Sequence, residues 1–266
     1  MYDFAYQKPG SVGDAVNALK GDMEAKALAG GMTFIPVLKQ RLNKPSMVVD
    51  LAKTGLSGIT SSGSTVTIGA MSTHRMIMDD PTIKAKIPGL SEMASWIGDT
   101  QVRHRGTMGG SLANNDPSSC YPAAVLACDA SVKTDRRTIK ADEFFQGMFV
   151  TALEPDELVT AVEFPFTEKS AYEKFRNPAS RYAIVGVFVA KGPAGVRVAI
   201  TGAGQGGVFR HTEMEAALAS NFSADAIANI KTPADGLNGD IHASPEYRAH
   251  LIGVMAKRAV AKAAGR

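Results

Sequence analysis

The stretch Ala27-Leu-Ala-Gly-Gly-Met-Thr-Phe-Ile-Pro-Val-Leu-Lys39 decides how the rest of the sequence is interpreted. It is typical of a short buried strand that ends in a glycine pair and continues directly into a helix. The glycines permit positive φ and close approach of a ligand, and Thr33 can cap the helix. Unpaired N–H groups at such a corner, together with the helix dipole, suit an anionic phosphate. Most corners of this kind are plain tight turns, so this stretch alone favours a turn.

A second glycine-rich stretch makes a ligand site more plausible than a plain turn. Residues 106–122 read Gly-Thr-Met-Gly-Gly-Ser-Leu-Ala-Asn-Asn-Asp-Pro-Ser-Ser-Cys-Tyr-Pro and follow a polar run without hydrophobic periodicity. We expect one long loop that ends where a helix begins near Tyr121. A solvated turn is the alternative, but loops of this length in a compact domain are usually functional or disordered, and the clear helix start argues against disorder. Two loops suited to phosphate predict a dinucleotide.

Length and composition limit the class of protein. The 266 residues could form one large domain or two to three small ones, and no apolar run approaches the roughly 20 residues of a membrane span. The N-terminus lacks the regions of a signal peptide, which predicts a cytoplasmic protein. The net charge of +3 is small and the basic residues are scattered, which argues against nucleic-acid binding. The run Arg103-His104-Arg105 could meet a phosphate, contact a partner or form a solvated turn.

Cysteine and histidine provide no metal site. The two cysteines, Cys120 and Cys128, form neither a disulfide framework nor a ligand spacing, and the five histidines are dispersed. An iron–sulfur cluster commonly needs four cysteine thiolates, so this chain is not expected to hold one. Any redox cofactor held by the chain itself is therefore expected to be organic.

Hydrophobic patterns predict two α/β units in the first 167 residues. In residues 1–55, Ser11 and Asp14 form a capping-box variant before a helix over 12–20, with strands over 25–29 and 47–51. In residues 56–167 we expect strands over 58–60, 65–69, 131–134, 138–140 and 158–164, and helices over 73–78, 90–96 and 122–129. Trp96, Phe144, Phe145, Met148 and Phe149 are interpreted as core residues.

Residues 168–266 are predicted to form a separate C-terminal domain. A polar break follows Pro165, and strands over 172–176, 183–190 and 195–201 fit an antiparallel sheet. Helices are expected over 212–218 and 224–230, and a long one begins at Ser244, where Ser244 as N-cap and Pro245 at the first helical position are strong start signals.

Ordered matches along the whole chain resemble one family. They comprise Ala29-Gly-Gly-Met-Thr33, Val66-Thr-Ile-Gly-Ala-Met71, Thr107-Met-Gly-Gly-Ser111 with Asp116-Pro117, Pro155 to Pro165, Tyr172 to Gly186 and Val198-Ala-Ile-Thr-Gly-Ala203. Together they resemble the FAD-binding medium subunit of the molybdenum hydroxylases, of the aerobic carbon monoxide dehydrogenase type, with xanthine dehydrogenase more distant. The resemblance implies an α+β protein: a PCMH-type FAD-binding fold of two α/β subdomains, then a C-terminal domain with a three-stranded antiparallel sheet and helices.

The resemblance also implies an electron-transfer role. FAD, held non-covalently, would take electrons from a small subunit with [2Fe-2S] clusters, after a large subunit with the molybdenum cofactor has oxidised the substrate. The acceptor would be quinone or NAD, and the complex a dimer of heterotrimers in the cytoplasm or peripheral at the inner face of the membrane. The sequence does not name the substrate. Two alternatives stay open: a self-sufficient FAD-dependent oxidoreductase and a flavin-free scaffold subunit.

Site residues follow from the same resemblance, which assigns no catalytic residue. The first glycine stretch would wrap the pyrophosphate, the second would face it, and Tyr182 would shield the isoalloxazine. Arg176 would approach the flavin, with Lys174 close by. The family loop reads Asp-Pro-x-x-Asp, and Cys120 replaces its second carboxylate, so Asp116 would substitute or the affinity would fall. The implied set is Leu28, Ala29, Gly30, Gly31, Met32, Thr33, Phe34, Ile97, Thr107, Gly109, Gly110, Ser111, Asp116, Cys120, Val159, Arg176 and Tyr182.

Overall fold

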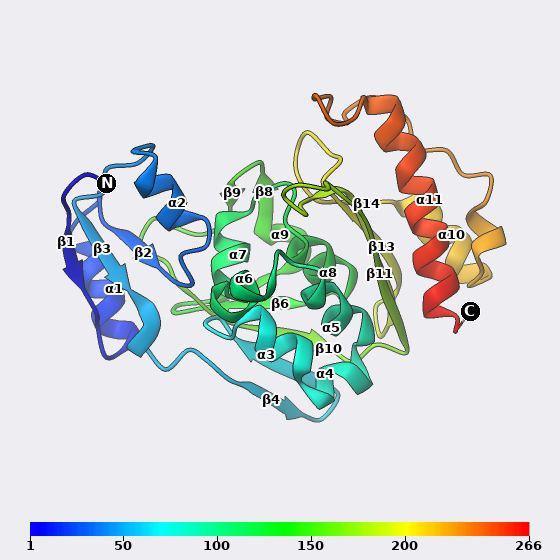
Figure 1. Ribbon diagram of the computed structural model, residues 1–266. Coiled ribbons are helices and arrows are strands. Elements are labelled where there is room, and N and C mark those ends of the chain that lie inside the picture. The colour runs from blue at the N-terminus through cyan, green and yellow to red at the C-terminus, as the bar shows by residue number, and fades with distance from the viewer. Residues whose placement is uncertain (266) are drawn as a thin grey trace.

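The computed structural model describes residues 1–265 and shows three parts in a row, with the chain ends at opposite sides (Figure 1). The first part is a parallel three-stranded sheet in the order β1-β3-β2. Ser11 Oγ accepts the N–H of Asp14, as predicted, and so starts the first helix. Its elements are β1 (Ala5–Gln7), α1 (Val12–Lys20), β2 (Lys26–Leu28), α2 (Phe34–Lys39), β3 (Met47–Asp50) and a 3-10 helix, η1 (Leu51–Lys53).

The middle part is built on an antiparallel five-stranded sheet in the order β4-β5-β10-β6-β7. A separate pair, β8 and β9, forms a short hairpin. Its strands are β4 (Ile59–Ser62), β5 (Thr65–Gly69), β6 (Ser131–Thr134), β7 (Thr138–Lys140), β8 (Phe145–Gly147), β9 (Val150–Thr151) and β10 (Val159–Pro165). Its helices are α3 (His74–Asp79), α4 (Pro81–Lys86), α5 (Pro88–Ser95), α6 (Thr100–Arg105), α7 (Met108–Asn114), α8 (Tyr121–Ala127) and α9 (Ala141–Phe144).

The third part is an antiparallel sheet in the order β11-β12-β13-β14, in which the two-residue β14 extends the three strands expected. The long helix α11 covers its outer face (Figure 1), and Ser244 caps that helix by accepting the N–H of Tyr247, as predicted. The elements are β11 (Lys169–Arg176), β12 (Ala183–Gly192), β13 (Gly195–Thr201), β14 (Phe209–Arg210), α10 (Thr212–Ser220), a 3-10 helix η2 (Ala224–Ile227) and α11 (Pro245–Ala263).

Two expectations about residues 106–149 are wrong. The second glycine stretch is not one long loop, because residues 108–114 form α7, which ends at Asn115 in the left-handed conformation. Met148 and Phe149 are not core: they are 45% and 56% exposed at the tip of the β8–β9 hairpin. Asn115 holds that hairpin, since its side-chain amide donates to the carbonyls of Gly147 and Val150. The two side chains therefore stand on a fixed turn outside the core.

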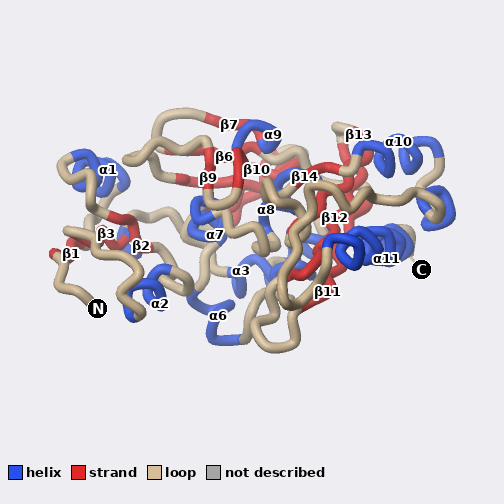
Figure 2. The backbone as a smooth tube through the Cα atoms, turned by 90° about the horizontal axis from the view of Figure 1, so that it is seen from above, coloured by secondary structure: helices blue, strands red, loops and turns tan. Residues whose placement is uncertain are grey.

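Three clusters of buried apolar side chains stabilise the three parts. Figure 2 shows the helices and strands of these parts from above. Their membership crosses the predicted domain limits. Leu158 packs in the N-terminal cluster with Val16 and Val49, while Tyr172 and Phe188 belong to the middle cluster. The limits 1–55, 56–167 and 168–266 therefore stay a proposal. No helix within residues 1–265 is both long and apolar enough to cross a membrane.

Candidate functional site

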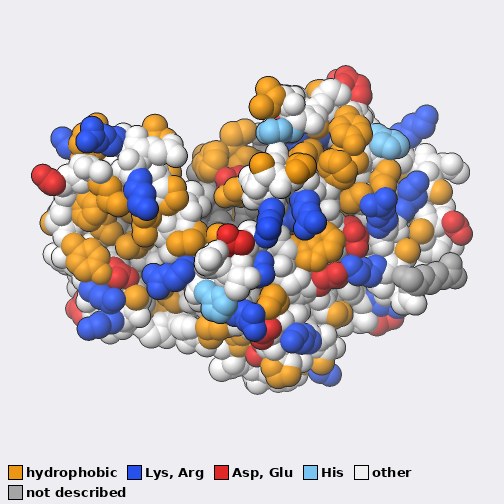
Figure 3. All heavy atoms as spheres, in the orientation of Figure 1, with side chains coloured by type: hydrophobic (Ala, Val, Ile, Leu, Met, Phe, Trp, Pro, Cys, Tyr) orange, Lys and Arg blue, Asp and Glu red, His pale blue; other side chains and the backbone are white. Residues whose placement is uncertain are grey.

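A cavity of about 600 Å³ lies where the three parts meet. Sites for small molecules commonly measure about 300–1,000 Å³, so the space suits a cofactor. Figure 3 shows the surface hollowed between the N-terminal part and the centre. Its walls are the loop 29–34, residues 70–71, Ile97 and Gly98, helix α7, the segment 116–120, the start of β10, and Lys174 with residues 180–182.

The first wall is the loop between β2 and α2. Gly31 has a φ of 76°, a conformation that favours glycine. The backbone N–H groups of residues 30–34 donate to no acceptor within residues 1–265. The predicted cap at Thr33 is wrong: Thr33 occupies the N-cap position with helical φ, and its side chain makes no capping bond. Five consecutive free amides therefore line the cavity, an arrangement that attracts phosphate. We call residues 30–34 the amide loop.

Gly30 brings the two glycine stretches into contact. A Cβ at Gly30 would overlap the carbonyl oxygen of Arg105 and would lie 2.8 Å from the Cα of Gly106. Only hydrogen fits there, because real Cβ atoms do not approach backbone atoms so closely. The need for glycine at this position therefore comes from contact between two backbones of the chain, and this contact sets where the amide loop stands.

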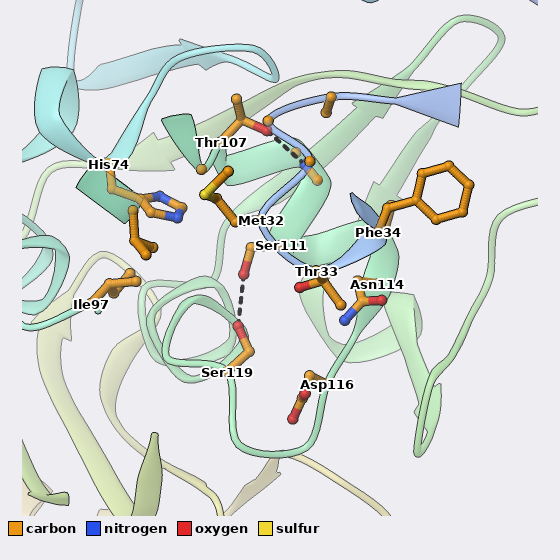
Figure 4. A pocket seen from close by; sticks show the side chains of 18 of the residues that line it. Met32, Thr33, Phe34, His74, Ile97, Thr107, Ser111, Asn114, Asp116 and Ser119 are labelled. Atoms are coloured by element: carbon orange, nitrogen blue, oxygen red, sulfur yellow. Dashed lines mark hydrogen bonds between the residues drawn. The ribbon is translucent and has the colours of Figure 1, made fainter. Parts of the chain in front are cut away.

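Helix α7 forms the opposite wall (Figure 4). Thr107 caps it by accepting the N–H of Gly110, and Ser111 Oγ lies 2.7 Å from Ser119 Oγ. The N–H groups of Met108 and Gly109 donate to the carbonyls of Ser72 and Ala70 at 3.1 and 2.9 Å. The first amides of α7 are thus used inside the protein. This wall offers hydroxyl groups and a close backbone, whereas free amides come from the amide loop.

All but two of the predicted site residues line the cavity. They are Ala29, Gly30, Gly31, Met32, Thr33, Phe34, Ile97, Thr107, Gly109, Gly110, Ser111, Asp116, Cys120, Val159 and Tyr182. Leu28 lies behind the amide loop, where its Cδ1 would be 3.2 Å from a Cβ on Gly31. Arg176 is exposed and does not line the cavity, whereas Lys174 is buried and does. The expectation for Arg176 is therefore wrong, and Lys174, which the sequence analysis named as close by, lines the cavity instead.

A β-bulge explains this exchange. Strand alternation would put Lys174 and Arg176 on one face of β11. The pairing of β11 with β12 shifts register between Phe175 and Arg176, however, and such a bulge turns the following side chain away. Other lining residues that the sequence analysis did not select include His74, Asn114, Ser119 and Arg181. Asn114 and Ser119 lie within the second glycine stretch and could have been found there; no motif marks His74.

Tyr182 and Asp116 meet at the mouth of the cavity. Tyr182 is 47% exposed, and its pKa is raised by partial burial and then by the negative charge of Asp116. Asp116 Oδ1 accepts the N–H of Ser118 at 2.8 Å. Tyr182 is therefore a protonated phenol at neutral pH, and about half of its side chain stays exposed. Its exposure argues against the alternative interpretation as an ordinary core tyrosine of the strand.

His74 is a buried neutral imidazole in the cavity wall. Its Nδ1 lies 3.2 Å from the hydroxyl of Tyr121, and its Nε2 would be 2.5 Å from a Cβ on Gly106. Burial, and then the charge of Arg103, lowers the pKa of His74 to about 4. In Figure 4, His74 and Met32 point into the cavity from different walls.

We predict that His74 makes the folded protein sensitive to acid. Below pH 6.5 the unfolded chain takes up a proton at His74, while the folded chain does so only near pH 4, so stability falls as pH decreases across this window. The full effect is about 3 kcal/mol. Urea unfolding at pH 7 and pH 4.5 measures it in wild type, in His74→Gln and in the exposed control His104→Gln. An unchanged pH dependence in His74→Gln would contradict the prediction.

Comparison with known proteins decides the family. Residues 2–167 match the family described as FAD binding domain in molybdopterin dehydrogenase. The chain belongs to this family. It is 35% identical to the carbon monoxide dehydrogenase medium chain of Hydrogenophaga pseudoflava, covering 97% of this chain and 96% of that one. It is 33% identical to the nicotine 6-hydroxylase medium subunit of Paenarthrobacter nicotinovorans, covering 98% and 97%.

The fold agrees with the sequence comparison. The solved structure of carbon monoxide dehydrogenase from Hydrogenophaga pseudoflava superimposes with a TM-score of 0.88 at 33% identity, over 99% of this chain and 98% of that chain. The expected α+β FAD-binding fold is thereby confirmed. This chain is the FAD-carrying medium subunit of a molybdenum hydroxylase, an oxidoreductase complex whose iron–sulfur clusters and molybdenum cofactor reside on partner subunits. Within residues 1–265, no three His, Cys, Asp or Glu side chains gather to hold a metal ion.

Proposed function

We propose that FAD lies along the cavity with its pyrophosphate on the amide loop. The observation that carries this assignment is the row of five free amides in a cavity of about 600 Å³. A dinucleotide phosphate would supply the acceptors that these N–H groups lack. Thr107 and Ser111 would add hydroxyl groups from the other wall, and Leu28 would support the loop from behind.

The other predicted residues would hold the ring system and the sugar. Tyr182, half exposed at the mouth, would cover one face of the flavin, while Ile97 and Val159 would contact it from the middle part. Asp116 and Cys120 would face the ribityl chain or the ring, and Arg176 has no role in this arrangement because it lies outside the cavity. A flavin accepts electrons singly or in pairs, so it can connect one-electron clusters to a two-electron acceptor. The task of these residues is to hold it in place and exclude water.

We further propose the route of the electrons. They would enter from a small iron–sulfur subunit and leave to quinone or NAD, within a dimer of heterotrimers in the cytoplasm. The substrate would be oxidised on the large subunit. Relatives named carbon monoxide dehydrogenase and nicotine 6-hydroxylase are 35% and 33% identical, so the similarity of this chain does not choose between such substrates.

The purified complex tests both parts of the proposal. We expect oxidised-flavin absorption bands, and release of one FAD per copy of this chain on denaturation. After anaerobic reduction with dithionite, rapid mixing with NAD or with a soluble quinone should reoxidise the flavin with one of the two. A complex that contains both partner subunits but no flavin would refute the proposed site. A flavin that reacts with neither compound would refute the proposed acceptors alone.

A further inference from the structure

Three cationic side chains donate hydrogen bonds to three consecutive backbone carbonyl groups that follow helix α5. Lys174 Nζ donates to the carbonyl of Trp96 at 2.8 Å. Arg103 Nη1 donates to the carbonyls of Ile97 and Gly98, both at 3.2 Å. Arg181 Nη1 donates to the carbonyl of Gly98 at 3.0 Å. We call Arg103, Lys174 and Arg181 the cation cluster. It joins the middle part to the C-terminal sheet.

The cluster has no carboxylate partner. Within residues 1–265, no Asp or Glu oxygen lies within 4.0 Å of a charged nitrogen of these three side chains. The other contacts of Lys174 Nζ are the carbonyl of Arg181 at 3.0 Å and Cys120 Sγ at 3.5 Å. Nearby acids are engaged elsewhere: Glu173 binds Lys262, Asp99 caps α6 and Asp116 accepts from Ser118.

Such an arrangement is electrostatically incomplete. Lys174 is 6% exposed, and buried charges are normally paired, because a charge without a counter-ion in a low dielectric is costly. Carbonyl dipoles at the C-terminal end of a helix offset part of this cost. Arg103 Nε is also buried without a hydrogen-bond acceptor. The cluster therefore holds more positive charge than its protein surroundings balance.

Two members of the cation cluster, Lys174 and Arg181, line the cofactor cavity together with Ile97 and Gly98, whereas Arg103 does not. Helix α6 separates the cluster from the amide loop, since Gly98 precedes its N-terminus while Arg105, at its C-terminal end, contacts Gly30. The cavity thus has two places that favour negative charge. One consists of neutral amides suited to phosphate, and the other consists of fixed cations.

We infer that the cation cluster provides the counter-charge for the flavin ring when it carries added electrons, and that Cys120 keeps Lys174 free for this role. This inference rests on the proposed function. A carboxylate beside Lys174 Nζ would be a strong acceptor and a counter-ion, whereas Cys120 offers one sulfur at 3.5 Å, which is a weak hydrogen-bond acceptor. The protein wall would then bind reduced FAD more tightly than oxidised FAD, which raises the midpoint potential of the cofactor.

The test compares the affinity of the protein for the two redox states. In Lys174→Met complexes we expect the preference for reduced over oxidised FAD to fall at least tenfold, about 30 mV for this two-electron couple. Cys120→Asp should shift the potential in the same direction. Lys174→Arg retains the charge and should lie near wild type. Cys128→Ser, at a buried cysteine outside the cavity, is the matched control. Spectroelectrochemical titration of the flavin bands gives the potentials.

The cation cluster could instead bind the pyrophosphate of FAD. ADP distinguishes the pyrophosphate from the flavin ring, because it contains the first and lacks the second. If the cluster serves the ring, Lys174→Met leaves the affinity for ADP unchanged. Equal losses of affinity for ADP, oxidised FAD and reduced FAD would overturn the inference and assign the cluster to phosphate. Unshifted potentials in Lys174→Met and Cys120→Asp complexes that retain FAD would also overturn it, while leaving the proposed function standing. A wild-type complex that contains no FAD would refute the proposed function first.

Discussion

Replacing Gly30 with alanine is expected to lower the affinity for FAD about 10- to 100-fold. The added methyl group would overlap the carbonyl oxygen of Arg105, a backbone atom that cannot rotate away. Overpacking of this kind commonly costs about 1–3 kcal/mol, and here the strain is relieved by moving the amide loop away from α6. The free amides then no longer face the cavity in register. The dissociation constant for FAD, measured by fluorescence titration of the apoprotein, reports the change directly.

Gly10→Ala is the matched control for this experiment. A Cβ at Gly10 meets no atom within 4 Å, so this variant should bind FAD as wild type does. Urea unfolding of both apoproteins separates local displacement from general destabilisation. If Gly30→Ala folds and retains FAD at wild-type affinity, the contact between the two glycine stretches does not set the position of the amide loop, and the proposed phosphate site is wrong.

Arg248→Met is expected to destabilise the C-terminal part by about 3–5 kcal/mol. Arg248 is 3% exposed in α11; its Nη1 donates to the carbonyls of Ile184 and Gly202 at 2.6 and 2.9 Å, and its Nη2 to Asp240 at 2.6 Å. Methionine fills a similar volume but leaves two buried carbonyls without donors and one carboxylate without its counter-ion. Urea unfolding followed by circular dichroism measures the loss.

Arg258→Met provides the comparison, because Arg258 lies on the same helix but is exposed. Surface substitutions of this kind usually change stability by less than about 0.5 kcal/mol. A loss below about 1 kcal/mol in Arg248→Met would mean that the two carbonyls find water or another donor, and that Arg248 does not hold α11 to the sheet.

Local signals explain which parts of the fold could be predicted. The start of α11 follows from Ser244 and Pro245, because a cap and a proline at the first turn act within a few residues. The strands β12 and β13 follow from segments rich in valine and isoleucine. Helix α7 could not be found in this way, because Gly109 and Gly110 are poor helix formers. Besides the local cap at Thr107, tertiary contacts stabilise α7: the amides of Met108 and Gly109 donate to the carbonyls of Ser72 and Ala70.

The part of the site that consists of backbone groups could be predicted from the sequence. The side chains that line the rest of the cavity were harder to predict. The glycine pair at 30 and 31 is visible in the sequence, and the structure gives it a cavity and free amides. The choice between Lys174 and Arg176 depends on a register shift in β11, which no local pattern reveals. His74 and Arg181 enter the cavity through contacts between distant segments, so only the assembled structure identifies them.

The membership of Leu158 in the N-terminal cluster bears on biosynthesis. Leu158 packs there with residues of α1 and β3, and Lys20 reaches Asp156 at 4.0 Å. A ribosome releases residues 1–53 about a hundred residues before Leu158 becomes available. During synthesis, the N-terminal cluster therefore lacks the side chain of Leu158 until the middle part has emerged from the ribosome. The cofactor cavity is complete later still, because Tyr182 also lines it.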